Sequence, residues 1–306
     1  MNIVFASDDN YASYLGVTIF SILMHNQNAK IDFYILDLGI SAESREAVSQ
    51  LVGSHGCSVS FVQVDKNDFI QMPQTIDYIS IASYARLKVA EYLQDIDRAL
   101  YLDVDILVTG SLQPLWETDL EGRYVGACFD PYVEFELPGY KNKIGLQEQD
   151  YYFNAGVLLM DLGKWRDYDV FAKTLAWLGG YRDVIQYQDQ DILNGIFKDK
   201  VKFLDCRFNF MPFERSRMKR AKKQSGFELH PLEKATVPVV ITHYCGKEKA
   251  WHADCVHTNA YLFADIFRKL EHVPHGWTKS VCRVGMKNRW EKIFHSIKDK
   301  YFYSIY

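Results

Sequence analysis

Two aspartates separated by one residue, Asp103 and Asp105, follow the apolar residues Ala99–Leu102. We expect residues 98–108 to form one buried strand, along which side chains alternate between two faces. Asp103 and Asp105 would then point the same way, and Val104 the other way. A hard divalent cation would relieve the repulsion between the two carboxylates and leave positions open for phosphate. Pairing with Arg or Lys side chains is the alternative.

A second chemical motif is His243-Tyr-Cys-Gly-Lys-Glu-Lys249-Ala-Trp, at the end of a strand expected over 237–242. Imidazole beside two carboxylates suits Mn²⁺ better than Mg²⁺, and Lys249 would add a positive charge for phosphate. A lone histidine can equally be a structural hydrogen-bonding partner. The chain contains neither a GxGxxG motif after a strand nor a GxxxxGK[ST] motif, so phosphate binding must rely on metal and side chains.

The third motif, Tyr187-Gln-Asp-Gln-Asp191, begins a helix that we expect to run through Phe197. Acidic residues are favourable at a helix N-terminus because of the helix dipole, which is a sufficient structural reason for them. Amides and carboxylates are also the groups that bind sugar hydroxyls. The motif therefore has a structural and a functional interpretation.

The elements that would position these motifs alternate between strands and helices. Strands are expected at 3–6, 31–38 and 59–64, and helices over 14–24, 41–51 (with Ser41 as N-cap) and 84–93. Further strands are expected at 123–129 and 155–160, and Pro238 would begin the strand at 237–242. The β-α-β order predicts an α/β fold with a mostly parallel sheet, whose ligands bind at the C-terminal strand ends.

Composition excludes several classes of protein. With 306 residues, 48% hydrophobic and 24% charged, the chain resembles a folded globular protein and neither a disordered nor a membrane-spanning one. The apolar run at 14–24 is short and follows Asp8 and Asp9, which is unlike a signal peptide and indicates a cytoplasmic protein. Six cysteines lack CxxC spacing and are expected to be reduced. A net charge of −4 argues against general nucleic-acid binding.

Taken in order, six segments resemble glycosyltransferase family 8. They extend over most of the chain, from residue 2 to about residue 255, and together are far more specific than one DxD motif. Within the family, the chain looks most similar to bacterial enzymes that add α-1,4-linked galactose to lipooligosaccharide. The segments are Ala6–Tyr11, Ser83–Leu87, Tyr101–Asp105, Tyr152–Leu158, Gln188–Asn194 and His243–Gly246.

This resemblance implies a GT-A fold, Mn²⁺ (or Mg²⁺), and a hexose moved from a UDP-sugar to a terminal sugar of lipooligosaccharide or lipopolysaccharide with retention of configuration. Galactose is the expected hexose and glucose the alternative. Residues 1–265 would form the catalytic domain and residues 266–306 a small helical appendage. By a different interpretation, the DxD motif would belong to a haloacid-dehalogenase phosphatase, but Leu107 stands where that class has Thr or Val.

The resemblance also assigns roles to individual residues. Gln190 would lie nearest the anomeric carbon, and because a neutral amide is a weak nucleophile we favour a front-face, ion-pair-like mechanism, with Asp191 as the fallback nucleophile and Asp189 beside the sugar. Asp8 and Asn10 would bind uracil and ribose, and Tyr11 would stack on the base. The metal ligands would be Asp103, Asp105 and His243; the donor site Ala6, Asp8, Asn10, Tyr11, Arg86, Val104, Asp130, Asn154, Gly246 and Lys249; and the acceptor site Tyr78, Tyr187, Phe213 and Cys245.

The C-terminal segment 277–306 differs from the rest of the chain. It carries seven basic and two acidic residues, and apolar residues recur in it at helical spacing from Met286 to Tyr301. A basic amphipathic helix is typical of interfacial membrane attachment, which would bring the enzyme to the inner face of the inner membrane, where a lipid-linked acceptor lies. A helix packed on the protein body with its charges in water is the alternative.

Overall fold

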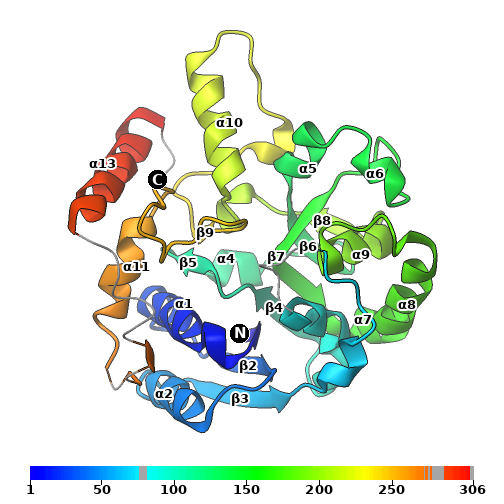
Figure 1. Cartoon of the computed structure of the whole chain (residues 1–306), viewed down its shortest axis with the longest axis horizontal. Helices are drawn as coiled ribbons and strands as arrows, with labels where there is room; N and C mark the ends of the chain where they lie inside the picture. Colours follow the sequence, from blue (N-terminus) through cyan, green and yellow to red (C-terminus); the bar gives the residue numbers. More distant parts are fainter. Residues whose placement is uncertain (76–80, 272, 275, 278–285, 304–306) are drawn as a thin grey trace.

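The computed structural model describes residues 1–75, 81–271, 273–274, 276–277 and 286–303. Within them, a seven-stranded sheet has the order β3-β2-β1-β4-β7-β6-β8, and a two-stranded sheet pairs β5 with β9 (Figure 1). The strands are β1 (Asn2–Ser7), β2 (Asp32–Asp37), β3 (Ser58–Gln63), β4 (Arg98–Leu102), β5 (Ile106–Val108), β6 (Val125–Phe129), β7 (Phe153–Asp161), β8 (Val201–Phe203) and β9 (Ile241–His243).

The large sheet is mostly parallel, as the sequence predicts. β3, β2, β1 and β4 pair in parallel, and β6 pairs in parallel with β8. β7 is antiparallel to both of its neighbours, β4 and β6. The N-terminal end of β7 therefore lies beside the C-terminal ends of β4 and β6, where the polar motifs gather.

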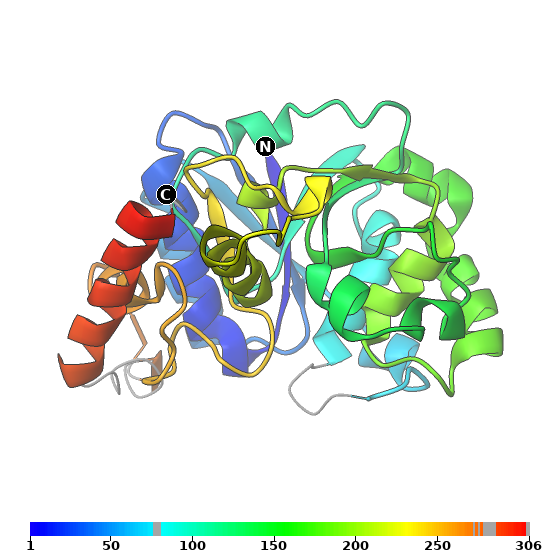
Figure 2. The same cartoon turned by 90° about the horizontal axis from the view of Figure 1, so that it is seen from above.

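Helices cover both faces of this sheet, because its strands are apolar on both sides. Along β1, Ile3 and Phe5 belong to one buried cluster with α1, while Val4 and Ala6 belong to another with α9. Figure 2 shows α13 (red) at one end of the molecule and the green helices at the other. The helices are α1 (Ala12–His25), α2 (Ala42–Gly53), α3 (Val89–Tyr92), α4 (Gln113–Trp116), α5 (Pro131–Glu136), α6 (Tyr140–Lys143), α7 (Leu162–Tyr168), α8 (Val170–Tyr181), α9 (Gln188–Phe197), α10 (Pro212–Lys223), α11 (Ala260–Phe267) and α13 (Met286–Tyr303).

Two expected strands are placed differently. The single strand expected over 98–108 is wrong, since the chain turns at 103–105 and β4 and β5 belong to different sheets. The hydroxyl of Thr18 donates to the carbonyls of Val104 and Ile106, at 2.8 and 3.0 Å, which holds this turn against α1. The strand expected from Val237 begins only at Ile241, where pairing with β5 starts.

The C-terminal segment packs on the body. Trp277 is buried and lies so close to Gly16 of α1 that a Cβ there would be 2.6 Å from its ring. α13 contacts both α11 and α10. The division at residue 265 stays a prediction. In the described part of the chain, no helix has the length and apolar character needed to cross a membrane, and the five cysteines there are free thiols.

Candidate functional site

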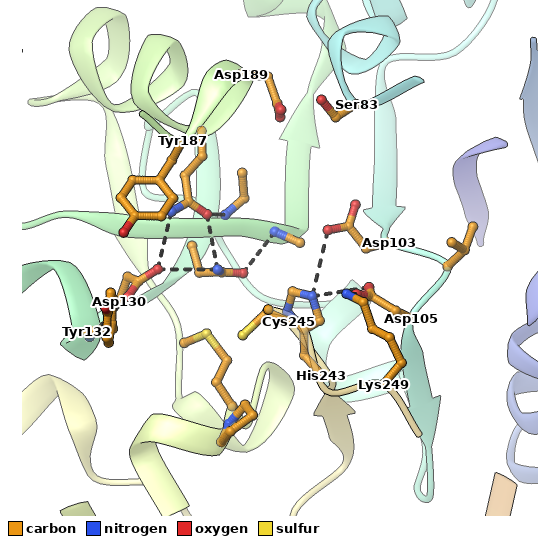
Figure 3. A pocket seen from close by; sticks show the side chains of 18 of the residues that line it. Ser83, Asp103, Asp105, Asp130, Tyr132, Tyr187, Asp189, His243, Cys245 and Lys249 are labelled. Atoms are coloured by element: carbon orange, nitrogen blue, oxygen red, sulfur yellow. Dashed lines mark hydrogen bonds and ion pairs between the residues drawn. The ribbon is translucent and has the colours of Figure 1, made fainter. Parts of the chain in front are cut away.

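A cavity of about 650 Å³ opens where β1, β4, β6 and β9 end and β7 begins (Figure 3). It brings together segments that span the chain from Ala6 to Lys249. Its walls include most of the expected site residues: Ala6, Asp8, Tyr11, Arg86, Asp103, Val104, Asp105, Asp130, Asn154, Tyr187, Asp189, Gln190, Phe213, His243, Cys245, Gly246 and Lys249.

The three expected metal ligands converge on one point. His243 Nε2 lies 3.7 Å from Asp103 Oδ2 and 3.3 Å from Asp105 Oδ1. The second oxygen of each aspartate pairs with a cation, Arg86 at 2.7 Å from Asp103 and Lys249 at 2.5 Å from Asp105. Each carboxylate thus uses one oxygen for an ion pair and offers the other. Two carboxylate oxygens and an imidazole nitrogen within 4.8 Å of one another fit a divalent cation.

Hydrogen bonds fix the tautomer of His243. The backbone N–H of Gly156 donates to Asn154 Oδ1, so that atom is an oxygen and Asn209 must donate to it through Nδ2. The oxygen of Asn209 then faces His243 Nδ1 at 2.9 Å. Nδ1 therefore carries the proton, and the lone pair of Nε2 points to the metal position. Asn209 is fully buried and was not predicted from the sequence, where it belongs to no motif.

Gly156 allows the metal ligands to approach the start of β7. A Cβ at this position would lie 2.2 Å from His243 Cε1 and 2.9 Å from Asp103 Oδ2. The Gly156 carbonyl also accepts from the Asp103 N–H, at 2.9 Å. Absence of a side chain is thus what allows His243 and Asp103 to come together. Gly156 lies within a segment that carries the family resemblance, but nothing in the sequence shows this steric role.

The turn after β9 carries Lys249 back to the metal position. Gly246 has a φ of +88°, a conformation that residues with a side chain rarely adopt. Burial alone would raise the pKa of Asp105, but the charge of Lys249 is the largest opposing effect and holds the pKa below its usual value. Asp105 is therefore ionised over the whole physiological range and ready to bind a cation.

Arg86 links the candidate metal site to the polar motif that begins α9. Its guanidinium pairs with Asp103 at 2.7 Å and with Asp189 at 2.9 Å, and it lies over the ring of Tyr101 at 4.3 Å. Burial raises the pKa of Asp189 to about 6, although the Arg86 charge opposes the shift. Asp189 is thus a buried carboxylate that depends on Arg86 to remain ionised.

Gln190 lies on the cavity wall, and three groups hold its side chain. Its Oε1 accepts from the side chain of Asn154 and the N–H of Ala155, both at 3.0 Å, and its Nε2 donates to Asp130 Oδ2 at 3.2 Å. Asp130 also caps α5 through its other oxygen. Both lone pairs of the Gln190 carbonyl are occupied, so this side chain is a fixed dipole.

Asp191, the expected fallback nucleophile, does not line the cavity. It is fully buried behind the N-terminus of α9, where the hydroxyls of Tyr140 and Tyr152 donate to it, as do the N–H groups of Gln186 and Tyr187. With both oxygens bound and no opening to the cavity, its geometry is that of a structural residue.

The β1 end of the cavity carries the residues expected to bind the nucleoside. Asp8 accepts from the Tyr11 N–H, and Tyr11 is half-buried beside the stacked rings of Tyr14 and Trp251, whose centroids are 3.8 Å apart. Asn10 is exposed, donates to Asp8 at 3.3 Å and does not line the cavity itself.

The opposite wall is aromatic. Tyr187 and Phe213, expected at the acceptor site, line it. Cys245 lines the cavity beside His243 (Figure 3), and Tyr78 lies outside the described residues. Tyr132, which the sequence did not single out, meets Phe213 edge-on with centroids 5.4 Å apart. Its position two residues after Asp130 is the one sequence signal that could have identified Tyr132. Its contact with Phe213 depends on the fold, which places α5 next to α10.

The comparisons agree with this geometry. A family model described as Glycosyl transferase family 8 matches residues 2–255. The chain belongs to glycosyltransferase family 8. The resemblance inferred from the motifs is therefore confirmed, and the phosphatase alternative is wrong.

Family 8 relatives cover nearly the whole chain. A Haemophilus influenzae protein named as a glycosyltransferase is 41% identical over 302 residues, 98% of this chain and 88% of that protein. Lipopolysaccharide 1,2-glucosyltransferase of Escherichia coli K12 is 28% identical over 82% of this chain and 73% of its own length. A crystal structure of the galactosyltransferase LgtC with donor and acceptor sugar analogues matches with a TM-score of 0.86 and 44% identity, over 92% of this chain and all of that one. The GT-A fold is thus confirmed.

Proposed function

We propose that this protein is a retaining galactosyltransferase that uses UDP-galactose and Mn²⁺ and extends a terminal sugar of lipooligosaccharide or lipopolysaccharide, forming an α-1,4 linkage. One observation carries the proposal: a three-atom metal site and Lys249 face the same cavity as Asp189 and Gln190. Similarity to LgtC supports galactose, and similarity to a lipopolysaccharide glucosyltransferase supports the acceptor class.

The donor would extend along the cavity from β1 to α9. Asp8 and Asn10 would bind uracil and ribose, Tyr11 the face of the base, and Ala6 and Val104 the adjoining backbone. Lys249 and Gly246 would hold the diphosphate beside Asp103, Asp105 and His243. A divalent cation bound by these three side chains would stabilise negative charge on the departing diphosphate. The galactose would lie among Arg86, Asp130, Asn154, Asp189 and Gln190.

The reaction would proceed on one face of the sugar. The bond from the anomeric carbon to the β-phosphate oxygen breaks as the acceptor hydroxyl oxygen bonds to the same face, and the hydroxyl proton passes to the departing phosphate oxygen. The Gln190 carbonyl dipole would stabilise positive charge on the anomeric carbon. The enclosed position of Asp191 supports this front-face path over a double displacement through that residue.

The direct test is release of UDP from UDP-galactose, UDP-glucose and their N-acetyl forms, with Mn²⁺, with Mg²⁺ and with chelator. We expect UDP-galactose with Mn²⁺ to give the fastest release and chelator to abolish it. Release from none of the four with either metal would contradict the proposal. Faster release from UDP-glucose would favour the alternative donor, which similarity to the E. coli glucosyltransferase supports.

We also propose peripheral attachment to the inner face of the inner membrane through α13. The outer side of this helix carries four large apolar residues that are 72, 62, 50 and 71% exposed: Trp290, Phe294, Ile297 and Tyr301. Their spacing places them in one stripe, with Lys298 and Lys300 at its two sides. Apolar side chains flanked by lysines match an interface of acyl chains and anionic headgroups.

Vesicle co-sedimentation tests this attachment. The full-length protein should sediment with vesicles that contain anionic lipid, and the double variant Trp290→Ser, Phe294→Ser should lose most of this binding. Leu175→Ser, which removes an exposed apolar side chain from α8, is the matched control and should bind like the unchanged protein. Equal binding by the double variant, or by a chain that lacks residues 277–306, would contradict the proposal.

A further inference from the structure

Asp299 lies on the inner side of α13 and is fully buried. One carboxylate oxygen accepts from Arg215 Nε at 2.5 Å and from the Thr258 hydroxyl at 2.9 Å. The other pairs with Lys219 Nζ at 2.6 Å. The apolar stripe of α13 faces outward, so this helix turns a charged group toward the body of the protein. Such a buried carboxylate with two cations is held in one geometry.

Both cations come from α10, which links Asp299 to the cavity. Arg215 and Lys219 are four residues apart, so they lie on one side of that helix and both pair with the Asp299 carboxylate. The first turn of α10 forms part of the aromatic wall through Phe213 and Ser216. Figure 1 shows α10 standing between α13 and α5 and projecting from the body.

Among the described elements, α10 packs chiefly on α5 and α13. Met218 of α10 packs against the buried cluster of Phe210 and Val239. On the α5 side, Arg217 pairs with Glu233 and lies 3.8 Å from the centre of the Phe135 ring. The Asp299 ion pairs form the opposite support. Loss of either support would free the helix to shift and, with it, the ring of Phe213.

We propose that Asp299 is a positioning residue for acceptor binding: through Arg215 and Lys219 it holds α10, and thereby Phe213, at the aromatic wall. This inference rests on the proposed transferase function. The metal ligands have supports of their own, Asn209, Gly156 and the Thr18-bound turn, none of which belongs to α10. Loss of Asp299 should therefore weaken acceptor binding and leave donor chemistry intact.

The test compares two reactions of Asp299→Asn in the full-length protein. The first is UDP release by hydrolysis of the UDP-sugar selected above, without acceptor. The second is transfer to the water-soluble oligosaccharide obtained from lipooligosaccharide by mild acid. We expect the acceptor KM to rise by between twofold and tenfold, as for loss of the Phe213 ring itself, and the hydrolysis rate and the donor KM to stay within twofold.

Asp265→Asn is the matched control, because Asp265 pairs with Arg289 of α13 at 3.0 Å but does not contact α10. It should change neither reaction. If Asp299→Asn is unfolded at the assay temperature, Lys219→Met decides, and a rise of threefold or more in the acceptor KM is expected for it. An acceptor KM within twofold of the original, or an equal loss of hydrolysis, would overturn the inference. Absence of hydrolysis in the unchanged protein would instead contradict the proposed function.

Discussion

On the metal side of the cavity (Asp103, Asp105, His243), side chains extend from strand ends and hydrogen bonds tie them to the sheet. On the aromatic side (Tyr132, Tyr187, Phe213), rings extend from helix ends. Tyr132 meets Phe213 edge to face, and the helix that carries Phe213 is held by ion pairs to α13. Strand ends have little freedom to move, whereas a projecting helix can shift. The difference suggests a rigid site for the reaction itself and an adjustable one for the acceptor.

Asp103→Asn should have the largest effect, because it weakens both the metal site and the Arg86 ion pair. We expect hydrolysis and transfer to fall together by roughly 100-fold to 1000-fold, the usual cost of losing a group that stabilises transition-state charge. Both rates are measured by UDP release, and circular dichroism should show a folded protein. The surface variant Asp68→Asn is the control. A loss of transfer alone would remove the distinction between the two sides.

The pH dependence of stability tests the buried charge of Asp189 in metal-free protein. Its pKa is raised from 3.8 to about 6, so between these values the native state holds a proton that the unfolded chain has released. The free energy of unfolding should therefore fall as pH rises from about 4 to 6, by at most about 3 kcal/mol at 1.36 kcal/mol per pKa unit. Asp189→Asn should lack this component. Urea denaturation of both proteins at four pH values measures the free energy of unfolding. The same pH dependence in the two proteins would contradict the prediction.

Asn209→Leu tests whether the metal side depends on its supporting hydrogen bonds. Loss of such a partner to a ligating histidine typically costs about 10-fold to 100-fold in metal affinity. Titration of free Mn²⁺ by electron paramagnetic resonance measures this without any turnover. Asn67→Ala, in an exposed 3₁₀ turn (Lys66–Phe69), should bind as the unchanged protein does. Unchanged affinity in Asn209→Leu would mean that the strand ends alone hold His243.

Phe213→Ala should have the smallest effect and act on transfer alone. An aromatic contact contributes about 0.5–1.5 kcal/mol beyond its buried area, so the acceptor KM should rise roughly 2-fold to 10-fold. Hydrolysis of the donor should stay within twofold. Steady-state kinetics with the soluble oligosaccharide measures the acceptor KM, and release of UDP without acceptor measures hydrolysis. Phe227→Ala, in the loop that follows α10, is the control. An equal fall in hydrolysis would show that the two sides do not act separately.

Local sequence patterns were sufficient to predict the first strands and the Ser41 N-cap. Both the spacing of apolar residues along a strand and the hydrogen bond of an N-cap involve only a few neighbouring residues. Local patterns failed at 98–108, where the apolar run is continuous in the sequence. The turn that divides this run into β4 and β5 is held by residues that are distant in the sequence. Thr18 binds the turn, and β9 recruits residues 106–108 into a second sheet. No neighbouring residue in the sequence indicates either contact.

The distinction between local patterns and long-range contacts also applies to the candidate site. The sequence was sufficient to select Asp103, Asp105 and His243, because carboxylates and imidazole are common metal ligands and the three segments match a family. Asn209 and Gly156 act by completing a hydrogen-bond chain and by leaving space, and both roles depend on atoms far away in sequence. Asp191 shows the converse, since a carboxylate beside the expected catalytic residues is bound by two tyrosines and points away from the cavity.

The outward stripe of α13 affects how the purified protein should behave. Four large apolar side chains in water favour any arrangement that covers them, and a second copy of the same stripe is one such cover. The apparent mass in solution should thus depend on protein concentration and fall when a mild detergent is added. A preparation without residues 277–306 would lack this stripe, but its acceptor kinetics would describe an enzyme that has lost one support of its aromatic wall.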